Sequence, residues 1–205
     1  MKSMRTTSFG ENRPLSLVDK VGIGLSNHKV VKIIQKFPKA PIVLDIGCGY
    51  NANLLKILAP FITKGYGFDI STTNNLSFDN LALINGPIEV TLYDCDLAPV
   101  DIILMISVIE HITDPLPIVK KCREILNRGG ILIINVPTWR GKTFLEWLAF
   151  KWHLSPEAEM NDHKMYYDKR DLWPLLIKAG FLPSDISLTY HKFGLNLFCV
   201  CRNCL

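Results

Sequence analysis

The sequence predicts an α/β fold in which a mixed seven-stranded sheet, mostly parallel, carries helices on both faces. Short apolar segments alternate with helical patterns along the 205 residues, as is typical of such a sheet. The run 102–106 is apolar throughout, which indicates a strand buried on both faces. Near the end of the chain, apolar segments at 182–190 and 195–202 are separated by a short turn at 192–194. This spacing predicts an antiparallel hairpin at one edge of the sheet.

The other elements follow from periodicity and from helix-ending residues. Helices are expected at 15–26 and 28–37; in the second, Val30, Val31 and Ile34 share one face, and Pro38 ends it. Asp168 opens the last helix and Gly180 closes it. The remaining strands are predicted at 41–46, 65–70, 81–85, 101–107 and 131–135, and the remaining helices at 52–58, 114–127, 140–152 and 168–179. Residues 153–166 are expected to form a polar loop.

Length and composition bound the class of protein. A chain of 205 residues, 48% hydrophobic and 20% charged, fits a single globular domain over 1–205. The uncharged apolar stretch 102–109 is far shorter than the roughly 20 residues needed to cross a bilayer. The N-terminus has no apolar region typical of a secretory signal, so a cytoplasmic location is expected.

Positive charge is concentrated at the N-terminus. The net charge is +4, but residues 1–39, an expected helical extension, hold eight Lys/Arg and two Asp/Glu. We interpret this segment as a solvated helix face; peripheral contact with an anionic membrane surface is the alternative. The remainder of the chain is not basic, which argues against a nucleic-acid partner.

A glycine turn follows the strand expected at 41–46 and opens a helix. Gly47 and Gly49 permit close approach of a ligand to the backbone, in a Rossmann-like arrangement. Asp69, twenty residues past Gly49, can accept hydrogen bonds from both hydroxyls of a ribose. Two glycines followed by an acidic residue at this spacing are also typical of a binding site for a dinucleotide cofactor. Asp45 disfavours that reading, because its carboxylate would repel a pyrophosphate and attract a cationic amino group.

Four segments together resemble the class I SAM-dependent methyltransferases of the small-molecule type. They are 43–49, with the first motif; 67–71, with the acidic second loop; 106–115, which follows a strand; and 123–137. The resemblance runs from about residue 40 to the C-terminus, and 161–176 is also similar to methyltransferases of sugar, cell-surface polymer or quinone-like pathways. It implies S-adenosyl-L-methionine (SAM) as the cofactor, held by these residues: Asp45, Gly47, Cys48, Gly49, Asn51, Asp69, Ile70, Asn85, Ile88, Ser107 and Glu110.

Two positions depart from the family pattern. Asn51 stands where a third glycine is usual, and Asn tolerates the left-handed conformation. Pro87 offers no side-chain acceptor near the adenine, so adenine recognition is expected from Asn85, from the Ile88 N–H or from Asp94.

His111 is the first candidate for the chemistry. It lies just past the strand at 101–107, at the edge where open α/β sheets bind ligands, and it could take the acceptor's proton. A structural role is the alternative. His163 is the second catalytic candidate. An aromatic cluster made of Trp139, Phe144, Trp147, Phe150 and Trp152 is expected to form a substrate lid over 139–166, with a homodimer face as the alternative.

The sequence therefore predicts a SAM-dependent methyltransferase that acts on a small-molecule or glycan- or lipid-linked acceptor, at oxygen. A SAM-binding module that works through a partner protein remains the alternative. No metal site is predicted, because Cys199, Cys201 and Cys204 lack a fourth ligand and resemble core thiols.

Overall fold

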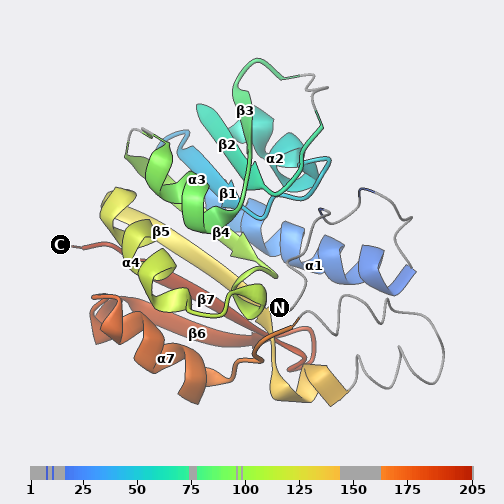
Figure 1. Cartoon of the computed structure of the whole chain (residues 1–205), viewed down its shortest axis with the longest axis vertical. Coiled ribbons are helices and arrows are strands. Elements are labelled where there is room, and N and C mark those ends of the chain that lie inside the picture. The colour runs from blue at the N-terminus through green and yellow to red at the C-terminus, as the bar shows by residue number, and fades with distance from the viewer. Residues whose placement is uncertain are drawn as a thin grey trace.

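The computed structural model describes residues 8, 11, 17–73, 78–95, 97, 99–143 and 163–204 (Figure 1). Its centre is a seven-stranded sheet in the order β3-β2-β1-β4-β5-β7-β6, which confirms the predicted fold class. The strands are β1 Ile42–Ile46, β2 Lys64–Asp69, β3 Leu81–Asn85, β4 Val100–Ile106, β5 Leu126–Pro137, β6 Ile186–His191 and β7 Asn196–Arg202. The helices that the structure describes from end to end are α1 Leu17–Ile34, α2 Asn53–Leu58, α3 Ile88–Asp94, α4 Pro115–Ile125 and α7 Lys169–Lys178. Three short 3-10 helices accompany them: η1 Ala59–Phe61, η2 Ile109–His111 and η3 Pro183–Asp185.

The first five strands pair in parallel, and β7 runs antiparallel between β5 and β6. The predicted C-terminal hairpin is therefore confirmed. Parallel pairing puts the carboxyl ends of β1, β2, β4 and β5 at one edge, where the loops that follow them meet.

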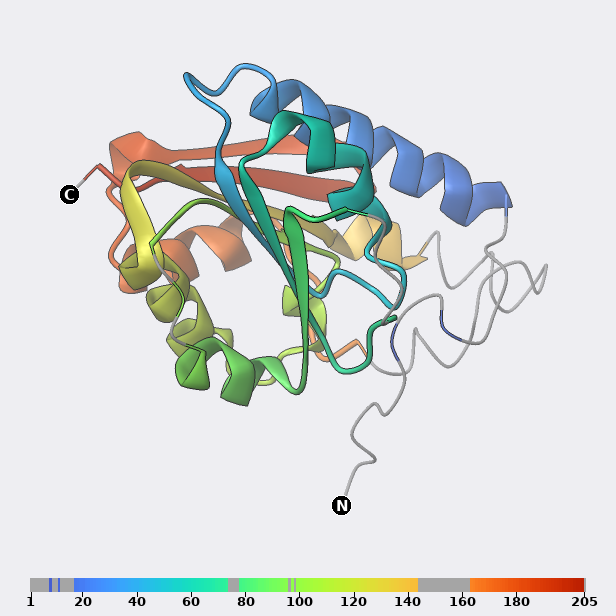
Figure 2. The ribbon, with the colours of Figure 1, turned by 90° about the horizontal axis from the view of Figure 1, so that it is seen from above.

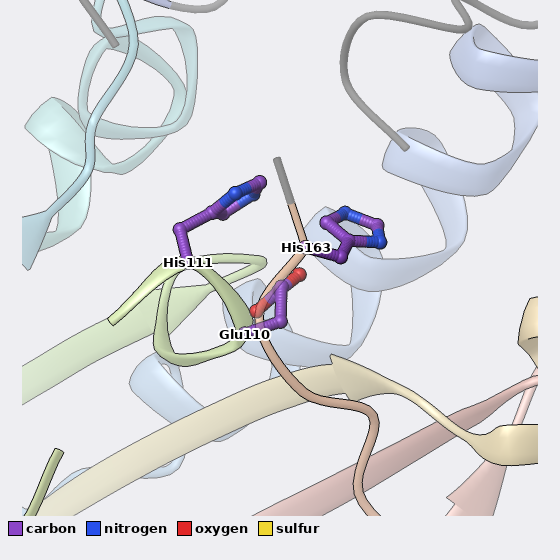
Figure 3. Close-up of side chains that lie close together, drawn as sticks. All are labelled: Glu110, His111 and His163. Atoms are coloured by element: carbon purple, nitrogen blue, oxygen red, sulfur yellow. The ribbon is translucent and has the colours of Figure 1, made fainter. Parts of the chain in front are cut away.

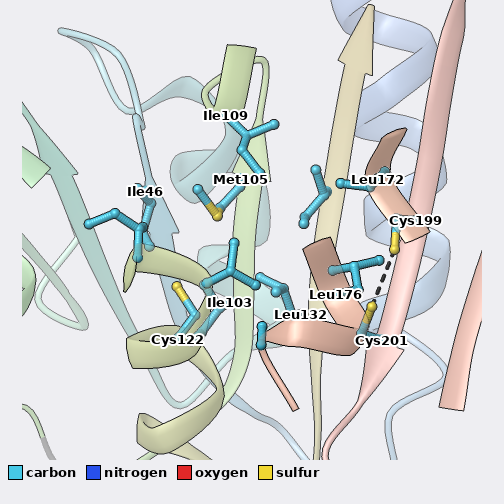
Figure 4. Packing of buried hydrophobic residues seen from close by; sticks show 14 of the residues in the cluster. Ile46, Ile103, Met105, Ile109, Cys122, Leu132, Leu172, Leu176, Cys199 and Cys201 are labelled. Carbon is cyan, nitrogen blue, oxygen red and sulfur yellow. Dashed lines mark hydrogen bonds between the residues drawn. The ribbon is translucent and has the colours of Figure 1, made fainter. Parts of the chain in front are cut away.

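Helices lie on both faces of the sheet (Figure 2), and an apolar layer packs them against each face. One layer joins α1 and α2 to one face, through buried side chains that include Val30, Ile34 and Leu55. The other joins α4 and α7 to the opposite face. Figure 4 shows part of this second layer, where Cys199 and Cys201 are buried with their sulfurs 3.3 Å apart. These two thiols are core residues, as predicted, whereas Cys204 is exposed.

The N-terminal helices predicted at 15–26 and 28–37 are in fact one helix, α1. Asn27 and His28 are weak helix formers, but neither breaks a helix, and burial of Val30 and Ile34 carries the helix through them. Lys29 was expected on a solvated face. Instead its Nζ lies 3.9 Å from the centre of the Phe198 ring and donates to Thr189 Oγ1 at 3.1 Å.

Other boundaries also differ from the expectation. The helix predicted at 114–127 ends at Ile125, and β5 begins at Leu126, ahead of Gly129 and Gly130. The short helix α3, with Leu92 buried, was not predicted. Of the helix expected at 140–152, residues 140–143 are helical and the rest lies outside the described residues. No helix in the described part of the chain is long and apolar enough to cross a membrane.

We expect Ile103→Ala to lower the free energy of unfolding by about 2–5 kcal/mol, since the Ile103 side chain is fully buried and its loss leaves a cavity. Ile57→Ala is the matched control, because Ile57 is 46% exposed on α2. Urea denaturation measures both variants. Equal losses in the two would contradict the assigned core.

Candidate active site

The glycine turn after β1 is held between two neighbouring strand ends. The N–H groups of Gly47 and Cys48 donate to Phe68 O at 2.7 and 3.1 Å, and Gly47 and Gly49 have φ values of 71° and 75°. A Cβ on Gly47 would lie 2.4 Å from Cγ2 of Val108, in the segment after β4. Glycine is thus required at position 47 by both conformation and space.

The left-handed residue that starts α2 is Ala52, with φ 47° and ψ 43°. Asn51 has no positive φ, so the turn does not use the tolerance of Asn for the left-handed conformation. Ala52 is fully buried, and its N–H donates to Gly49 O at 3.1 Å. A small side chain suits this closed position, where Asn would have to bury an amide.

Asp69, at the end of β2, connects the turn to the expected ribose position. Its Oδ2 accepts from Gly49 N at 2.7 Å, and its Oδ1 accepts from Ile70 N at 2.8 Å. The hydroxyl of Ser8 also bonds to Oδ1 and accepts from Ser71 N at 2.8 Å. The carboxylate therefore already binds a hydroxyl group, which is the chemistry that a ribose would present to it.

Asp45 is buried beneath the same turn, with 2% of its surface exposed. Burial, together with the nearby negative charge of Asp69, raises the pKa of the Asp45 carboxyl to about 8. A buried carboxyl of this kind is stabilised in its charged form by a cationic ligand.

The other predicted cofactor residues lie along the same edge. Asn85 pairs with Asp69 in the β2–β3 register, and its Oδ1 accepts from Thr72 Oγ1 at 2.5 Å. Ile88 begins α3, whereas Asp94 is exposed at its far end, which favours Asn85 and Ile88 over Asp94 for adenine. The remaining members are Cys48, whose thiol is buried with a raised pKa because of desolvation; Ile70, which is 36% exposed; and Ser107, which has φ 59°.

Glu110, His111 and His163 form a cluster between the segment that follows β4 and the segment that precedes α7 (Figure 3). Glu110 and His111 belong to η2, directly after β4. The N–H groups of Lys164 and Met165 donate to Glu110 O at 2.7 and 3.3 Å. These backbone bonds bring His163 beside His111, so that their ring centres are 4.8 Å apart. The two catalytic candidates therefore meet, although they are distant in sequence.

Tyr166 completes one wall of the cluster and was not identified from the sequence. Its hydroxyl lies 2.9 Å from His163 Nδ1, and its ring lies 5.7 Å from that of Trp139. Tyr166 is only 6% exposed, so this wall is packed. Of the predicted aromatic cover, Trp139 is described; Phe144, Trp147, Phe150 and Trp152 lie outside the described residues.

Lys192 is a second residue that sequence analysis missed. It sits in the turn between β6 and β7 with φ 51°, and it is partly buried. A Cβ added to Gly22 of α1 would lie 3.6 Å from the Lys192 Nζ. Burial lowers the pKa of Lys192 to about 8 against the opposing effect of the Glu110 charge. A turn lysine gives no signal in sequence that it points inward.

The sheet order, the glycine turn after β1 and the carboxylate after β2 define the class I methyltransferase fold. Residues 24–182 match the family model described as "Methyltransferase domain", and the chain belongs to that family. It is therefore a SAM-dependent methyltransferase, with SAM as its cofactor. The predictions of enzyme class and of cofactor are confirmed.

The chain is similar in sequence or in structure to several methyltransferases. A "Ubiquinone biosynthesis O-methyltransferase" of Cereibacter sphaeroides (strain KD131 / KCTC 12085) is 32% identical over 194 residues, which cover 86% of this chain and 76% of the relative. A "tRNA U34 carboxymethyltransferase" of Campylobacter jejuni is 32% identical over 99 residues, which cover 45% of this chain and 34% of the relative. The crystal structure of the plantazolicin methyltransferase BamL with a triazolic desmethylPZN analog and SAH has a TM-score of 0.66 at 15% identity, over 90% of each chain, and shares the fold.

The described residues fit SAM. A hydroxyl-binding carboxylate, a turn that leaves no room for a Cβ and a buried acid suited to an amino group stand together at the edge of the sheet.

We expect Asp69→Ala to weaken SAM binding at least about tenfold, because hydrogen bonds to a charged acceptor contribute about 1.5–3 kcal/mol each. Calorimetry measures the affinity. Asp79→Ala, which removes an exposed carboxylate before β3, is the control. Because Asp69 also holds Gly49 N, Asp69→Asn serves as a gentler second variant. Unchanged affinity in both Asp69 variants would contradict the assignment.

We expect SAM affinity to rise about tenfold between pH 6 and pH 7. With its pKa at about 8, Asp45 is mostly protonated at these pH values in the ligand-free protein. A cationic ligand binds the charged form, whose fraction increases with pH. The pH dependence should disappear in Asp45→Asn. A pH profile that is the same in this variant would assign the titration to another group.

Proposed function

We propose that this enzyme transfers the methyl group to a hydroxyl oxygen of a small-molecule or glycan- or lipid-linked acceptor in the cytoplasm. The observation that carries the proposal is the cluster of Glu110, His111 and His163. Two of its members follow Val108, the residue that lies against Gly47 of the glycine turn. The O-methyltransferase names of the relatives support oxygen as the acceptor atom. On this proposal the acceptor is not a nucleic acid.

On this proposal, one group of residues at the edge of the sheet binds the cofactor and another group binds the acceptor and takes its proton. The cofactor supplies an electrophilic methyl group on a sulfonium, which no side chain has to activate. Asp69, which accepts from Gly49 N, and the Gly47–Gly49 turn would hold the ribose of the cofactor, and the buried Asp45 would face its cationic amino group. On the other side, His111 and His163 lie where a hydroxyl can lose its proton to a neutral imidazole, and the oxygen becomes a better nucleophile as that proton leaves.

The basic N-terminal segment fits a lipid-linked acceptor. Lys20, Lys32 and Lys36 of this segment are exposed, and positive side chains are attracted to anionic lipid headgroups. On this proposal the contact is peripheral, and it brings the site close to an acceptor in the membrane surface.

We expect His111→Ala to retain SAM affinity and to lower kcat at least about 100-fold, since general base catalysis contributes about 10²–10⁴-fold. The assay follows formation of S-adenosylhomocysteine with a panel of phenols and sugar alcohols. His28→Ala removes an exposed histidine of α1 and should retain full activity.

The opposite pattern would assign His111 a structural role. In that case His111→Ala loses SAM affinity and keeps its turnover at saturation. If neither quantity changes, His163→Ala tests the second candidate in the same assay, and full activity in both variants would contradict the proposal.

A further inference from the structure

We propose that Ser8 competes with the ribose of SAM for the carboxylate of Asp69, so that the N-terminal segment restrains binding of the cofactor. The Ser8 hydroxyl bonds to Asp69 Oδ1 and to Ser71 O, and it accepts from Ser71 N at 2.8 Å. The inference concerns binding of the cofactor and is independent of which acceptor is methylated. It rests on the assignment of Asp69 to the ribose, which Asp69→Ala tests separately.

The backbone of Ser8 also holds it in this position. Its N–H donates to Glu11 Oε2 at 3.0 Å, and its carbonyl accepts from Glu11 N at 3.3 Å. Ser8 is only 6% exposed. A residue that is buried and bonded through its hydroxyl, its N–H and its carbonyl occupies a defined place, and this place is on the carboxylate expected to bind the ribose.

The number of acceptor positions on Asp69 decides between sharing and competition. The two oxygens of a carboxylate offer about four lone-pair positions. Oδ2 accepts from Gly49 N at 2.7 Å, and Oδ1 accepts from Ile70 N at 2.8 Å and bonds to the Ser8 hydroxyl. This leaves one position, on Oδ2, whereas the two hydroxyls of a ribose need two. The second hydroxyl therefore takes the position that Ser8 holds, because the two N–H groups belong to the backbone that forms the site.

Two states of Asp69 follow from this count. In one state Ser8 holds Oδ1, and in the other the ribose does. The apparent affinity for SAM is the intrinsic affinity multiplied by the fraction of protein in which Ser8 has left Asp69. A change that weakens the Ser8 contact therefore strengthens SAM binding, whereas loss of a residue that supports the cofactor weakens it. The sign of the effect separates the two roles.

The amide of Ser71 reports where Ser8 lies, because Ser71 N donates to Ser8 Oγ. If Ser8 leaves Asp69 when SAM binds, this amide loses its partner and exchanges its hydrogen with solvent faster. If Ser8 instead stays and covers the cofactor, the amide becomes better protected. Competition and covering thus predict opposite changes at one residue.

The first test measures the SAM affinity of the full chain by calorimetry. We expect Ser8→Ala to bind SAM about three- to tenfold more tightly, since it removes one hydrogen bond that competes with the ribose. Glu11→Ala should act in the same direction, although loss of a negative charge would by itself weaken the attraction to cationic SAM. Ser184→Ala removes an exposed hydroxyl that donates to Asp185 Oδ1 at 3.4 Å, and as the matched control it should leave the affinity unchanged.

The second test isolates the ribose. S-adenosylhomocysteine carries both ribose hydroxyls, and its 2′,3′-dideoxy analogue carries neither. We expect Ser8→Ala to strengthen binding of the first ligand about three- to tenfold and to leave binding of the analogue unchanged. Equal gains for the two ligands would overturn competition for the carboxylate, since they would show that Ser8 hinders the site by its bulk.

Hydrogen exchange of the parent protein, with and without SAM, completes the test. Faster exchange at Ser71 with SAM is the expected result, and slower exchange there would overturn the inference in favour of a cover. Unchanged or weaker SAM binding by Ser8→Ala would also overturn it. Thermal melting confirms that Ser8→Ala and Glu11→Ala are folded. Because no acceptor is used in these measurements, their outcome leaves the proposed methyl transfer to oxygen to its own assay.

Discussion

The parallel pairing of β1 with β2 and β4 is the constraint on which the rest of the site depends. It brings three strand ends to one edge, in a register that pairs Asp45 with Gly67 and with Leu104. The loops that follow these strands carry the glycine turn, Asp69 and the Glu110–His111 pair. Because the strands are buried on both faces, a slip in register would move core side chains into the wrong layer, so the edge is held in place by the whole core.

Asp69 extends this constraint into the cofactor site. A carboxylate that only bound ribose would be free to turn when the site is empty, but Asp69 also accepts from Gly49 N and Ile70 N. Its orientation is therefore set before a ligand arrives, which lowers the entropy lost on binding. Asp69 has a cost for its neighbour: its negative charge adds to the effect of burial, the larger cause, in raising the pKa of Asp45.

Much of the fold could be predicted from the sequence, and the exceptions have physical reasons. The strands could be predicted because an apolar run bounded by turn residues is a local signal. The continuity of α1 could not, since it depends on Val30 and Ile34 packing against a face that sequence does not show. The left-handed Ala52 was missed because Asn51 is the residue that intrinsic preference selects.

In the site, too, some residues could be placed from the sequence and others could not. Gly47, Gly49 and Asp69 form a motif with fixed spacing, so sequence analysis could place them together. The encounter of His163 with His111 depends on backbone bonds from Lys164 and Met165 to Glu110 O, which no spacing rule predicts.

The position of Lys192 also could not be predicted from the sequence. It and Phe193 both have positive φ, yet Phe193 is 97% exposed while Lys192 is partly buried. Positive φ at a non-glycine residue costs about 1–2 kcal/mol, and an exposed aromatic ring returns none of it. The strained hairpin thus places one residue in the solvent and the other partly inside, and the charge of Lys192 interacts with that of Glu110. The proposed acceptor side thus combines a buried acid, two imidazoles and an amine from three distant segments, whereas the glycine turn and Asp69 come from one strand–turn–helix unit and the strand beside it.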